Sequence, residues 1–375
     1  MCYRGYIYMS VRTEMYCNVE KESIETIRNN SRFQILRKNM QVGTEDSACS
    51  RCYFLEAQGH ESERTIQNAV WASQFKEFDF DKTSVTEDPV YLDIRLSNLC
   101  NLKCRMCSGY FSSSIQQEEN EIWGIKNKSQ VLNKRERADS IEYILKILPS
   151  VEKLYFAGGE PLMSPEHYQM LDRIVALGKT NIDLNYTTNF TRLTHGKHSA
   201  LDLWSHFSRV KVLASLDADY SVAEYVRHGT VWKDVLENYE LVRHLDNIDF
   251  SIMSTVGFMN VENLMRMQKN WVADKDFDLN KWFVHAMIGP ENLTLSVLPV
   301  DHKSKISSNI LAHAAWCSEQ GAYKLASQWQ SIDNYMMNND NTHHLLEFNR
   351  LTKIMDTHRN ESFSNVFPEF AYLLT

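Results

Sequence analysis

Apolar and polar residues alternate over residues 91–97, a period of two that is typical of a β-strand. Helical spacing appears at 141–148, where one apolar stripe is ended by Pro149. Since strand signals and helix signals take turns along this part of the chain, the pattern predicts an α/β fold with a parallel sheet. The other predicted strands are 151–156, 182–188, 210–216, 249–256 and 282–287.

The flanking parts of the chain have a different character. The front segment carries cysteines, with a strand predicted at 7–11 and a helix at 23–40. Polar residues dominate 108–130, which predicts a long loop, either a lid or an insertion. The predicted division is a small N-terminal domain, a linker, the α/β core and a helical C-terminal region, at 1–75, 76–89, 90–295 and 296–375.

Three cysteines follow directly after the strand at 91–97. Cys100, Cys104 and Cys107 are spaced C-x3-C-x2-C. Three thiolates on one loop can hold three irons of a cubane [4Fe–4S] cluster and leave the fourth iron open for chemistry. A three-cysteine zinc site and a set of buried thiols are the alternatives.

Polar residues also stand where three later strands end. Gly158-Gly159-Glu160-Pro161 follows the second strand, and Thr188-Asn189 and Ser215-Leu-Asp217 follow the next two. In parallel barrels the reactive residues lie at the carboxyl ends of the strands. The cysteine loop also lies at such a strand end. A Gly-Gly-Glu-Pro on its own is also simply a tight turn.

The chain resembles the radical S-adenosylmethionine (SAM) superfamily in the C-x3-C-x2-C loop, in the apolar Met106 before the last cysteine and in Gly-Gly-Glu-Pro one strand later. The resemblance implies a partial (β/α)6 barrel and a [4Fe–4S] cluster on Cys100, Cys104 and Cys107. It also implies that the open iron binds SAM, whose reductive cleavage yields a 5′-deoxyadenosyl radical.

Further residues are implied as SAM contacts by the same resemblance. Gly158, Gly159 and Glu160 would receive the methionine amine, and backbone atoms of Met106 would face the adenine. The ribose and the carboxylate of SAM would bind polar residues at the strand ends. Arg227 would pair with the SAM carboxylate. Each of these side chains has a plainer alternative, which is bonding to nearby backbone or, for Arg227, a solvated surface charge. The strand-end groups are Thr188, Asn189, Ser215 and Asp217.

The front segment contains a second cysteine set. Residues 48–64 resemble part of the twitch domain, a small module that carries an auxiliary cluster in some radical SAM enzymes, although here it precedes the barrel. The resemblance implies a second [4Fe–4S] cluster, and a structural zinc is the alternative. The ligands would be Cys2, Cys17, Cys49 and Cys52.

Composition limits the partners and the cellular location that we expect for this protein. The net charge of −8 argues against nucleic-acid binding, and the sequence contains no apolar run long enough to cross a bilayer. The first residues lack an apolar export segment, and iron–sulfur clusters require reducing conditions, so we expect a cytoplasmic protein. Cys317 stands alone and is expected to be a small buried side chain.

These observations predict a radical SAM enzyme of the oxidoreductase or maturase type. Its substrate would be a peptide or a small molecule, and an electron donor such as flavodoxin or ferredoxin would reduce the cluster. The alternative is a zinc-stabilised binding protein on a degenerate barrel. No chemistry is predicted for residues 296–375.

Overall fold

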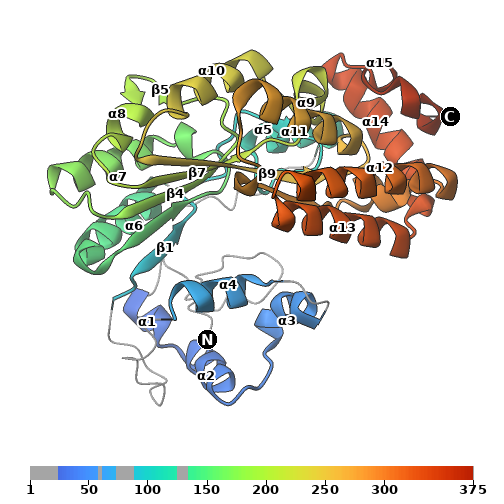
Figure 1. Ribbon diagram of the computed structural model, residues 1–375. Coiled ribbons are helices and arrows are strands. Elements are labelled where there is room, and N and C mark those ends of the chain that lie inside the picture. The colour runs from blue at the N-terminus through green and yellow to red at the C-terminus, as the bar shows by residue number, and fades with distance from the viewer. Residues whose placement is uncertain (1–23, 58–60, 73–87, 125–133, 375) are drawn as a thin grey trace. The chain divides into compact units, whose positions relative to one another are not determined.

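The computed structural model describes residues 24–57, 61–72, 88–124 and 134–374 (Figure 1). The chain divides into two compact units, 1–89 and 90–375. The strand predicted at 7–11, together with Cys2, Cys17 and most of the predicted linker, lies outside the described residues.

The described part of the first unit is helical. The predicted helix at 23–40 is interrupted, because Asn30 accepts a hydrogen bond from the backbone N–H of Phe33 (3.0 Å) and so starts a new helix. Ile27 and Phe33 form a small buried core beside Leu36. The elements are α1 (Ile24–Arg28), α2 (Ser31–Gln41), the 3₁₀ turn η1 (Ser47–Cys49), α3 (Ser50–Ala57) and α4 (Glu63–Val70).

The second unit is built on a sheet of six strands, each paired in parallel with the next one along the chain. This confirms the predicted α/β fold, and the sequential strand order is that of a partial barrel. The strands are β1 (Tyr91–Ile94), β3 (Lys153–Phe156), β4 (Asp183–Thr188), β7 (Val210–Ser215), β9 (Ile248–Val256) and β10 (Trp282–Ala286). Two short antiparallel ribbons accompany them: β2 (Lys103–Cys104) with β8 (Arg227–His228), and β5 (Thr194–His195) with β6 (His198–Ser199).

One face of the sheet forms the core and the other is more open. Leu154, Leu184 and Val212 occupy alternate positions on neighbouring strands and are fully buried. Residues at the intervening positions, such as Tyr155 and Asn185, are only half-buried. Burial on the first face is provided by the helices that connect the strands, which is why the apolar residues there alternate with polar ones. These helices are α6 (Lys134–Ile147), α7 (Pro165–Ala176), α8 (Ala200–Trp204), α9 (Tyr220–Val226), α10 (Trp232–Val242) and α11 (Val261–Lys275).

The C-terminal region is helical, as predicted, and shares the core of the sheet. On α13, Gln328 accepts a hydrogen bond from the backbone N–H of Val284 in β10 (3.0 Å). Cys317 on α12 is fully buried, which confirms the expectation for that residue. The elements are α12 (Val300–Glu319), α13 (Tyr323–Asn338), α14 (Leu345–Arg359), α15 (Phe363–Val366) and the 3₁₀ segment η9 (Pro368–Leu374).

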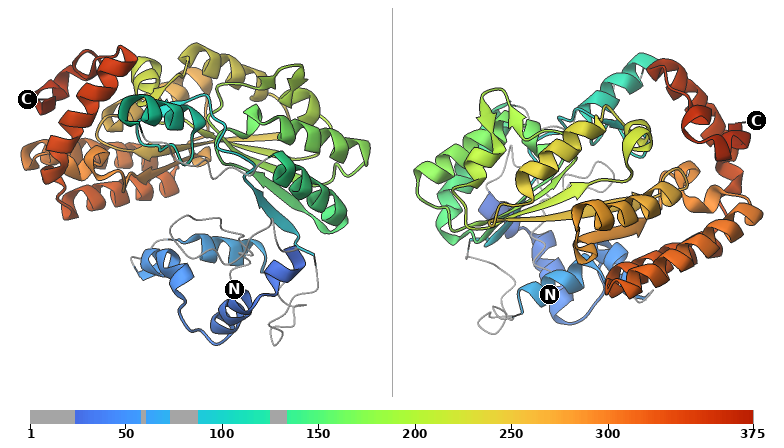
Figure 2. Two further views of the ribbon diagram at one scale, coloured as in Figure 1. Left: turned by 180° about the vertical axis from the view of Figure 1, so that it is seen from behind. Right: turned by 45° about the horizontal axis from the view of Figure 1, so that its top comes forward.

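The polar stretch 108–130 is not simply a loop, and this part of the prediction was wrong. It contains the helix α5 (Ser113–Trp123), which is capped by the Ser112 side chain and ended by Gly124 at φ +63°. The sequence of this stretch is polar because Ile115 and Glu118 are the only buried residues of α5. Both views in Figure 2 place α5 beside α14.

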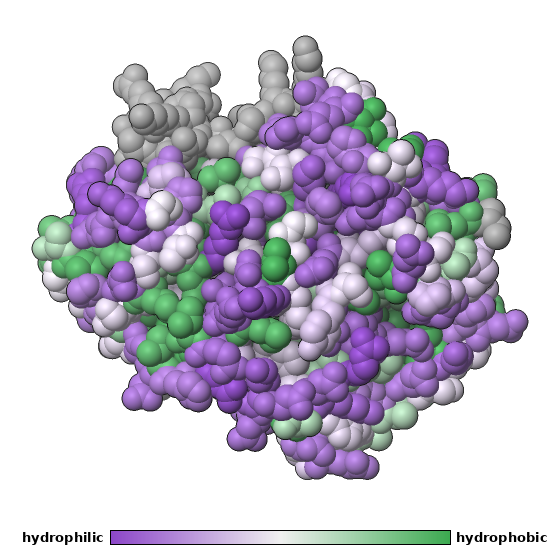
Figure 3. Space-filling model, turned by 90° about the horizontal axis from the view of Figure 1, so that it is seen from above, coloured by the Kyte–Doolittle hydropathy of each residue, from purple (hydrophilic) through white to green (hydrophobic). Residues whose placement is uncertain are grey.

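One face of the molecule is drawn in space-filling form in Figure 3. On the face drawn in Figure 3, hydrophilic residues prevail and hydrophobic residues occur in small groups between them. Within the described residues, no helix combines the length and apolar character that a membrane span requires.

Candidate functional site

The cysteine loop leaves the carboxyl end of β1 and is tied to β8. Cys104 pairs with Arg227 in the β2–β8 ribbon, and the backbone N–H of Arg105 donates to the carbonyl of Val226 (2.9 Å). Cys107 N–H donates to the carbonyl of Cys104 (3.0 Å), which closes a turn between these two ligand candidates. The loop conformation is therefore set by backbone bonds to a segment more than a hundred residues away in the sequence.

Serines at the start of α5 support the same loop. Ser114 donates its hydroxyl hydrogen bond to the carbonyl of Cys100 (2.6 Å), and Ser112 donates to that of Leu102 (2.8 Å). The backbone N–H of Cys100 donates to the Ser113 hydroxyl (3.2 Å). These residues were missed by the sequence analysis, in which they belonged to a long loop predicted to be a lid or an insertion; the run of three serines after the cysteines was the available signal.

The three thiols lie half-buried on this loop. Burial raises the pKa of Cys100 to about 12 and that of Cys107 to about 11, and it raises the pKa of Cys104 as well. Such thiols stay protonated unless a cation compensates the charge of the thiolate, which is what a bound metal does. The donor set is therefore suited to metal binding rather than to a free nucleophile.

A single metal ion and a cubane cluster place different demands on the described residues. Among them, no three His, Cys, Asp or Glu side chains are arranged to hold one ion. In a cubane cluster each cysteine binds a different iron, so the sulfurs lie farther apart than around a single zinc.

Gly158 and Gly159 follow β3 and touch the cysteine loop. On the side where a Cβ would stand, the space beside each glycine is filled by the protein itself. A Cβ on Gly159 would overlap the carbonyl oxygen of Leu99, and Gly158 has φ +121°. The backbone N–H groups of Gly159 and Glu160 donate to the carbonyls of Ser97 (3.1 Å) and Leu99 (2.7 Å). The two glycines thus dock the β3 turn onto the loop.

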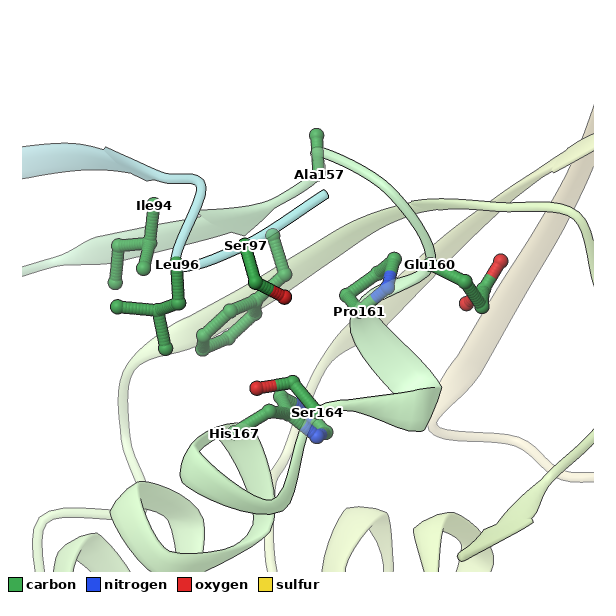
Figure 4. A pocket seen from close by; sticks show the side chains of 9 residues that line it. Ile94, Leu96, Ser97, Ala157, Glu160, Pro161, Ser164 and His167 are labelled. Atoms are coloured by element: carbon green, nitrogen blue, oxygen red, sulfur yellow. The ribbon is translucent and has the colours of Figure 1, made fainter. Parts of the chain in front are cut away.

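Glu160 joins the ends of β3 and β4. Its carboxylate accepts hydrogen bonds from the Thr188 hydroxyl (2.7 Å) and from the backbone N–H groups of Asn189 (2.6 Å) and Leu162 (3.0 Å). The side chain is buried, and burial raises its pKa to about 7 against the opposing effect of these bonds. Figure 4 shows its carboxylate turned away from the small pocket that Glu160 helps to line, between the ends of β1 and β3 and the start of α7.

Arg227 and Asp217 form a buried pair behind Cys104. The Nε of Arg227 donates to Asp217 at 2.7 Å, and its Nη1 lies 3.8 Å from the Cys104 sulfur. The other carboxylate oxygen of Asp217 accepts from the backbone N–H of Thr255 (2.8 Å). Arg227 is thus no solvated surface charge, and the alternative that treated it as one was wrong.

The remaining predicted contacts lie near the loop or at the same edge of the sheet. Asn189 donates to the side-chain oxygen of Asn101 (2.9 Å) and lies 3.9 Å from the Cys100 sulfur. Ser215 ends β7 and is half-buried. Met106 is half-buried and packs against the main core.

The second cysteine set is only partly described. Cys49 ends η1 and is half-buried, whereas Cys52 lies in the first turn of α3 and is buried. Four residues later, the Glu56 carboxylate binds the Ser62 hydroxyl and the Arg64 guanidinium, and Arg64 lies over the Tyr53 ring (5.0 Å). The residues that carried the resemblance to a twitch domain therefore hold α3 and the start of α4 together.

The second unit is thus an α/β protein with a three-cysteine loop at the carboxyl edge of a parallel sheet. Residues 94–268 match the family model described as the Radical SAM superfamily, and this range includes the cysteine loop, Gly158–Glu160 and Arg227. Residues 94–268 of this chain are thus similar to the radical SAM family. A search of curated proteins found no match.

Solved structures give similarities at the level of the fold. Native anSMEcpe with bound AdoMet is 19% identical over 62% of this chain and 62% of its own length, with a TM-score of 0.43. SuiB of Streptococcus suis bound to S-adenosylmethionine is 15% identical over 80% of this chain and 61% of its own length, with a TM-score of 0.42. This chain thus spans less than two thirds of the length of either protein.

Proposed function

We propose that this protein is a radical SAM enzyme that cleaves SAM reductively and uses the resulting 5′-deoxyadenosyl radical to abstract hydrogen from a substrate. The observation that carries the proposal is the direct docking of the Gly158–Glu160 turn onto the loop of Cys100, Cys104 and Cys107. Two sequence features that are expected to hold a cluster and SAM are joined by backbone hydrogen bonds. They sit at the edge of the sheet where parallel barrels carry their active sites.

The [4Fe–4S] cluster would be held by the thiolates of Cys100, Cys104 and Cys107, and when bound it supplies the electron for SAM cleavage. The protein's own contribution is electrostatic and steric. The Arg227 guanidinium near Cys104 favours the thiolate form, and Asp217 holds that guanidinium in place. The serines of α5 and the β8 backbone keep the loop in one conformation, so that ligand geometry is set before the cluster binds.

We propose that SAM binds along the same edge. The carboxylates of Glu160 and Asp217 are already occupied by hydrogen bonds from the protein, so we assign them the role of shaping the site. The contacts to SAM would come from backbone groups of this edge and from polar side chains near the cysteines. The proposed contact residues are Met106, Gly158, Gly159, Thr188, Asn189, Ser215 and Arg227, while Glu160 and Asp217 shape the site around them.

We propose that the substrate, a peptide or a small hydroxylated metabolite, binds over the half-buried face of the sheet. Polar side chains are paired there: the Tyr155 hydroxyl with Thr187 (2.7 Å) and Thr255 with His285 (2.9 Å). Such groups exchange hydrogen bonds with hydroxyl and amide groups without requiring a charged substrate. An electron donor such as flavodoxin or ferredoxin would reduce the cluster.

For the front unit we propose a second [4Fe–4S] cluster on Cys2, Cys17, Cys49 and Cys52. It would accept an electron from the substrate radical or bind the substrate. A structural zinc at the same cysteines is the competing assignment.

Metal analysis tests both sites together. Wild-type protein and a Cys100→Ala/Cys104→Ala/Cys107→Ala variant would be reconstituted anaerobically with iron and sulfide. We expect about eight irons per chain in the wild type and about four in the variant. Reductant-dependent formation of 5′-deoxyadenosine should be lost in the same variant.

Other metal contents would distinguish the proposed enzyme activity from the proposed second cluster. About four irons and one zinc in the wild type would retain the enzyme and make the front unit a structural zinc site. Zinc without iron in the wild type would contradict the radical mechanism and favour a binding protein.

A further inference from the structure

Cys104 stands between two basic residues whose side chains both reach carboxylates that are linked to the C-terminal helix α14. Arg105 is buried, and its Nη2 lies 2.5 Å from Asp356 and 2.6 Å from Glu361. Its guanidinium also lies over the Tyr225 ring, 3.7 Å from the ring centre. Arg105 is thus held by groups from α14, from the residues just after it and from α9.

Lys103, on the other side of Cys104, reaches a second buried carboxylate. Glu118 on α5 lies 3.4 Å from the Lys103 ammonium and accepts two hydrogen bonds from Arg359 (2.9 and 2.6 Å). Glu118 and Arg359 are almost fully buried. Helix α14 therefore reaches both neighbours of Cys104, one directly through Asp356 and one through Glu118.

The carboxylates that bind Arg105 are themselves fixed. Asp356 accepts hydrogen bonds from the Tyr225 hydroxyl (2.7 Å) and from the backbone N–H of Phe363 (2.7 Å). Glu361 lies 2.7 Å from the Nδ1 of His228, which belongs to the β8 strand paired with the loop. The network thus closes on itself, because the loop, β8 and the segment from α14 to Glu361 are each bonded to the other two.

A contribution to folding stability does not by itself explain why these charged side chains are buried together. Removing charges from water costs free energy that their attraction only partly returns, so buried ion pairs contribute little net stability. Their directional bonds do restrict the groups they join. Here the restricted groups are the residues on either side of one of the three thiols.

We propose that α14, together with the following residues to Glu361, is a positioning element that holds Cys104 in the conformation required for cluster binding. Arg105 and Lys103 transmit this restraint, which gives the C-terminal region a direct part in the chemistry. The inference rests on the proposed function, because it requires a cluster on Cys100, Cys104 and Cys107.

The test compares wild type with Asp356→Asn/Glu361→Gln, which removes both charges facing Arg105 and keeps the side-chain shapes. The matched control is Glu347→Gln/Arg350→Met, which removes an exposed ion pair on the same helix. Three quantities are measured after anaerobic reconstitution: the rate of iron release to a chelator, the electron paramagnetic resonance spectrum of the reduced cluster, and the melting temperature of the metal-free protein. To isolate this site, Cys49→Ala/Cys52→Ala is present throughout.

We expect iron release from the Asp356→Asn/Glu361→Gln variant to be at least about ten-fold faster than from wild type, with shifted g-values, and the control to match wild type. Arg105→Met should have a similar effect, and combining it with the carboxylate changes should add little, because all three act on one contact. Arg105→Lys retains a cation and should restore part of the slow release.

Two results would overturn the proposal. One is an Asp356→Asn/Glu361→Gln variant whose iron release, spectrum and melting temperature all equal those of the wild type. The other is a lowered melting temperature with wild-type release and spectra, which would make the network merely structural. If the wild-type protein takes up no iron, the result contradicts the proposed function, and with it this inference, before any variant is compared.

Discussion

Asn189 at the end of β4 donates a hydrogen bond to the side chain of Asn101 in the cysteine loop, at 2.9 Å and across 88 residues of sequence. Asn101 in turn donates to Thr191 (2.9 Å), whose hydroxyl donates back to Asn189 (2.7 Å). The end of β4 and the residue after Cys100 are thus tied by a small closed network. Two of the predictions below concern such links between segments distant in sequence.

Asn189→Ala should loosen the cysteine loop. It removes the bonds to Asn101 and Thr191, and loss of buried hydrogen bonds of this kind costs about 1–3 kcal/mol. Chemical denaturation should show a decrease in the free energy of unfolding in that range, and iron release should become faster. Asn280→Ala is a suitable control, because the Asn280 side chain is exposed and donates its hydrogen bond to Asp278 at the surface. Equal effects of the two substitutions would contradict a specific role for the β4 network.

Gly159→Ala should separate the β3 turn from the cysteine loop. The added Cβ would overlap the carbonyl of Leu99, and backbone at such a contact cannot move aside without breaking the bonds on either side. We expect a loss of about 1–3 kcal/mol or more in the free energy of unfolding and a reduced iron content. Gly289→Ala is the control, since a Cβ there meets open space. Full iron content in Gly159→Ala would show that the close approach is dispensable.

His167 should make the second unit sensitive to acid. Burial lowers the pKa of this histidine from its ordinary value of 6.5 to about 3, and its Nε2 is bonded to the Tyr186 hydroxyl (2.9 Å). Because the folded-state pKa lies below the unfolded value, the stabilising contribution is present above pH 6.5 and is lost as the pH falls toward 3. The loss approaches about 1.4 kcal/mol per pH unit.

The measurement is the free energy of unfolding between pH 7 and 4 for wild type and His167→Gln, which cannot take up the proton. The pH dependence should be shallower in the variant. His206→Gln, at an exposed histidine, should retain the wild-type slope. Identical slopes in all three proteins would show that protonation of His167 is not linked to unfolding.

Glu56→Gln should weaken metal binding in the front unit. The carboxylate holds both Ser62 and Arg64, and it lies one helical turn after Cys52. Without the charge, the segment that carries Cys49 and Cys52 loses its tie to α4. We expect faster release of metal from this site, measured in a protein that also carries Cys100→Ala/Cys104→Ala/Cys107→Ala. Lys38→Gln, at an exposed position of the same unit, should release metal at the wild-type rate.

Periodicity and motif spacing were sufficient to predict the second unit's α/β fold and the similarity of residues 94–268 to the radical SAM family. The alternation of apolar residues along each strand reports burial on one face, and this local property is visible in the sequence. The cysteine spacing and the Gly-Gly-Glu turn are likewise short-range patterns. Helix α5 was missed because its buried side chains, Ile115 and Glu118, contact partners that a local pattern does not reveal.

What only the tertiary structure decided is how the site residues are used. Glu160, Asp217 and Arg227 were predicted to meet SAM, and the structure shows that each already binds another part of the chain. The contact between Arg105 and Asp356 spans 251 residues and leaves no periodic trace in the sequence. A sequence determines which chemistry its residues offer within one loop or strand. Which charges meet across the fold depends on how helices pack, and that is a property of the whole core.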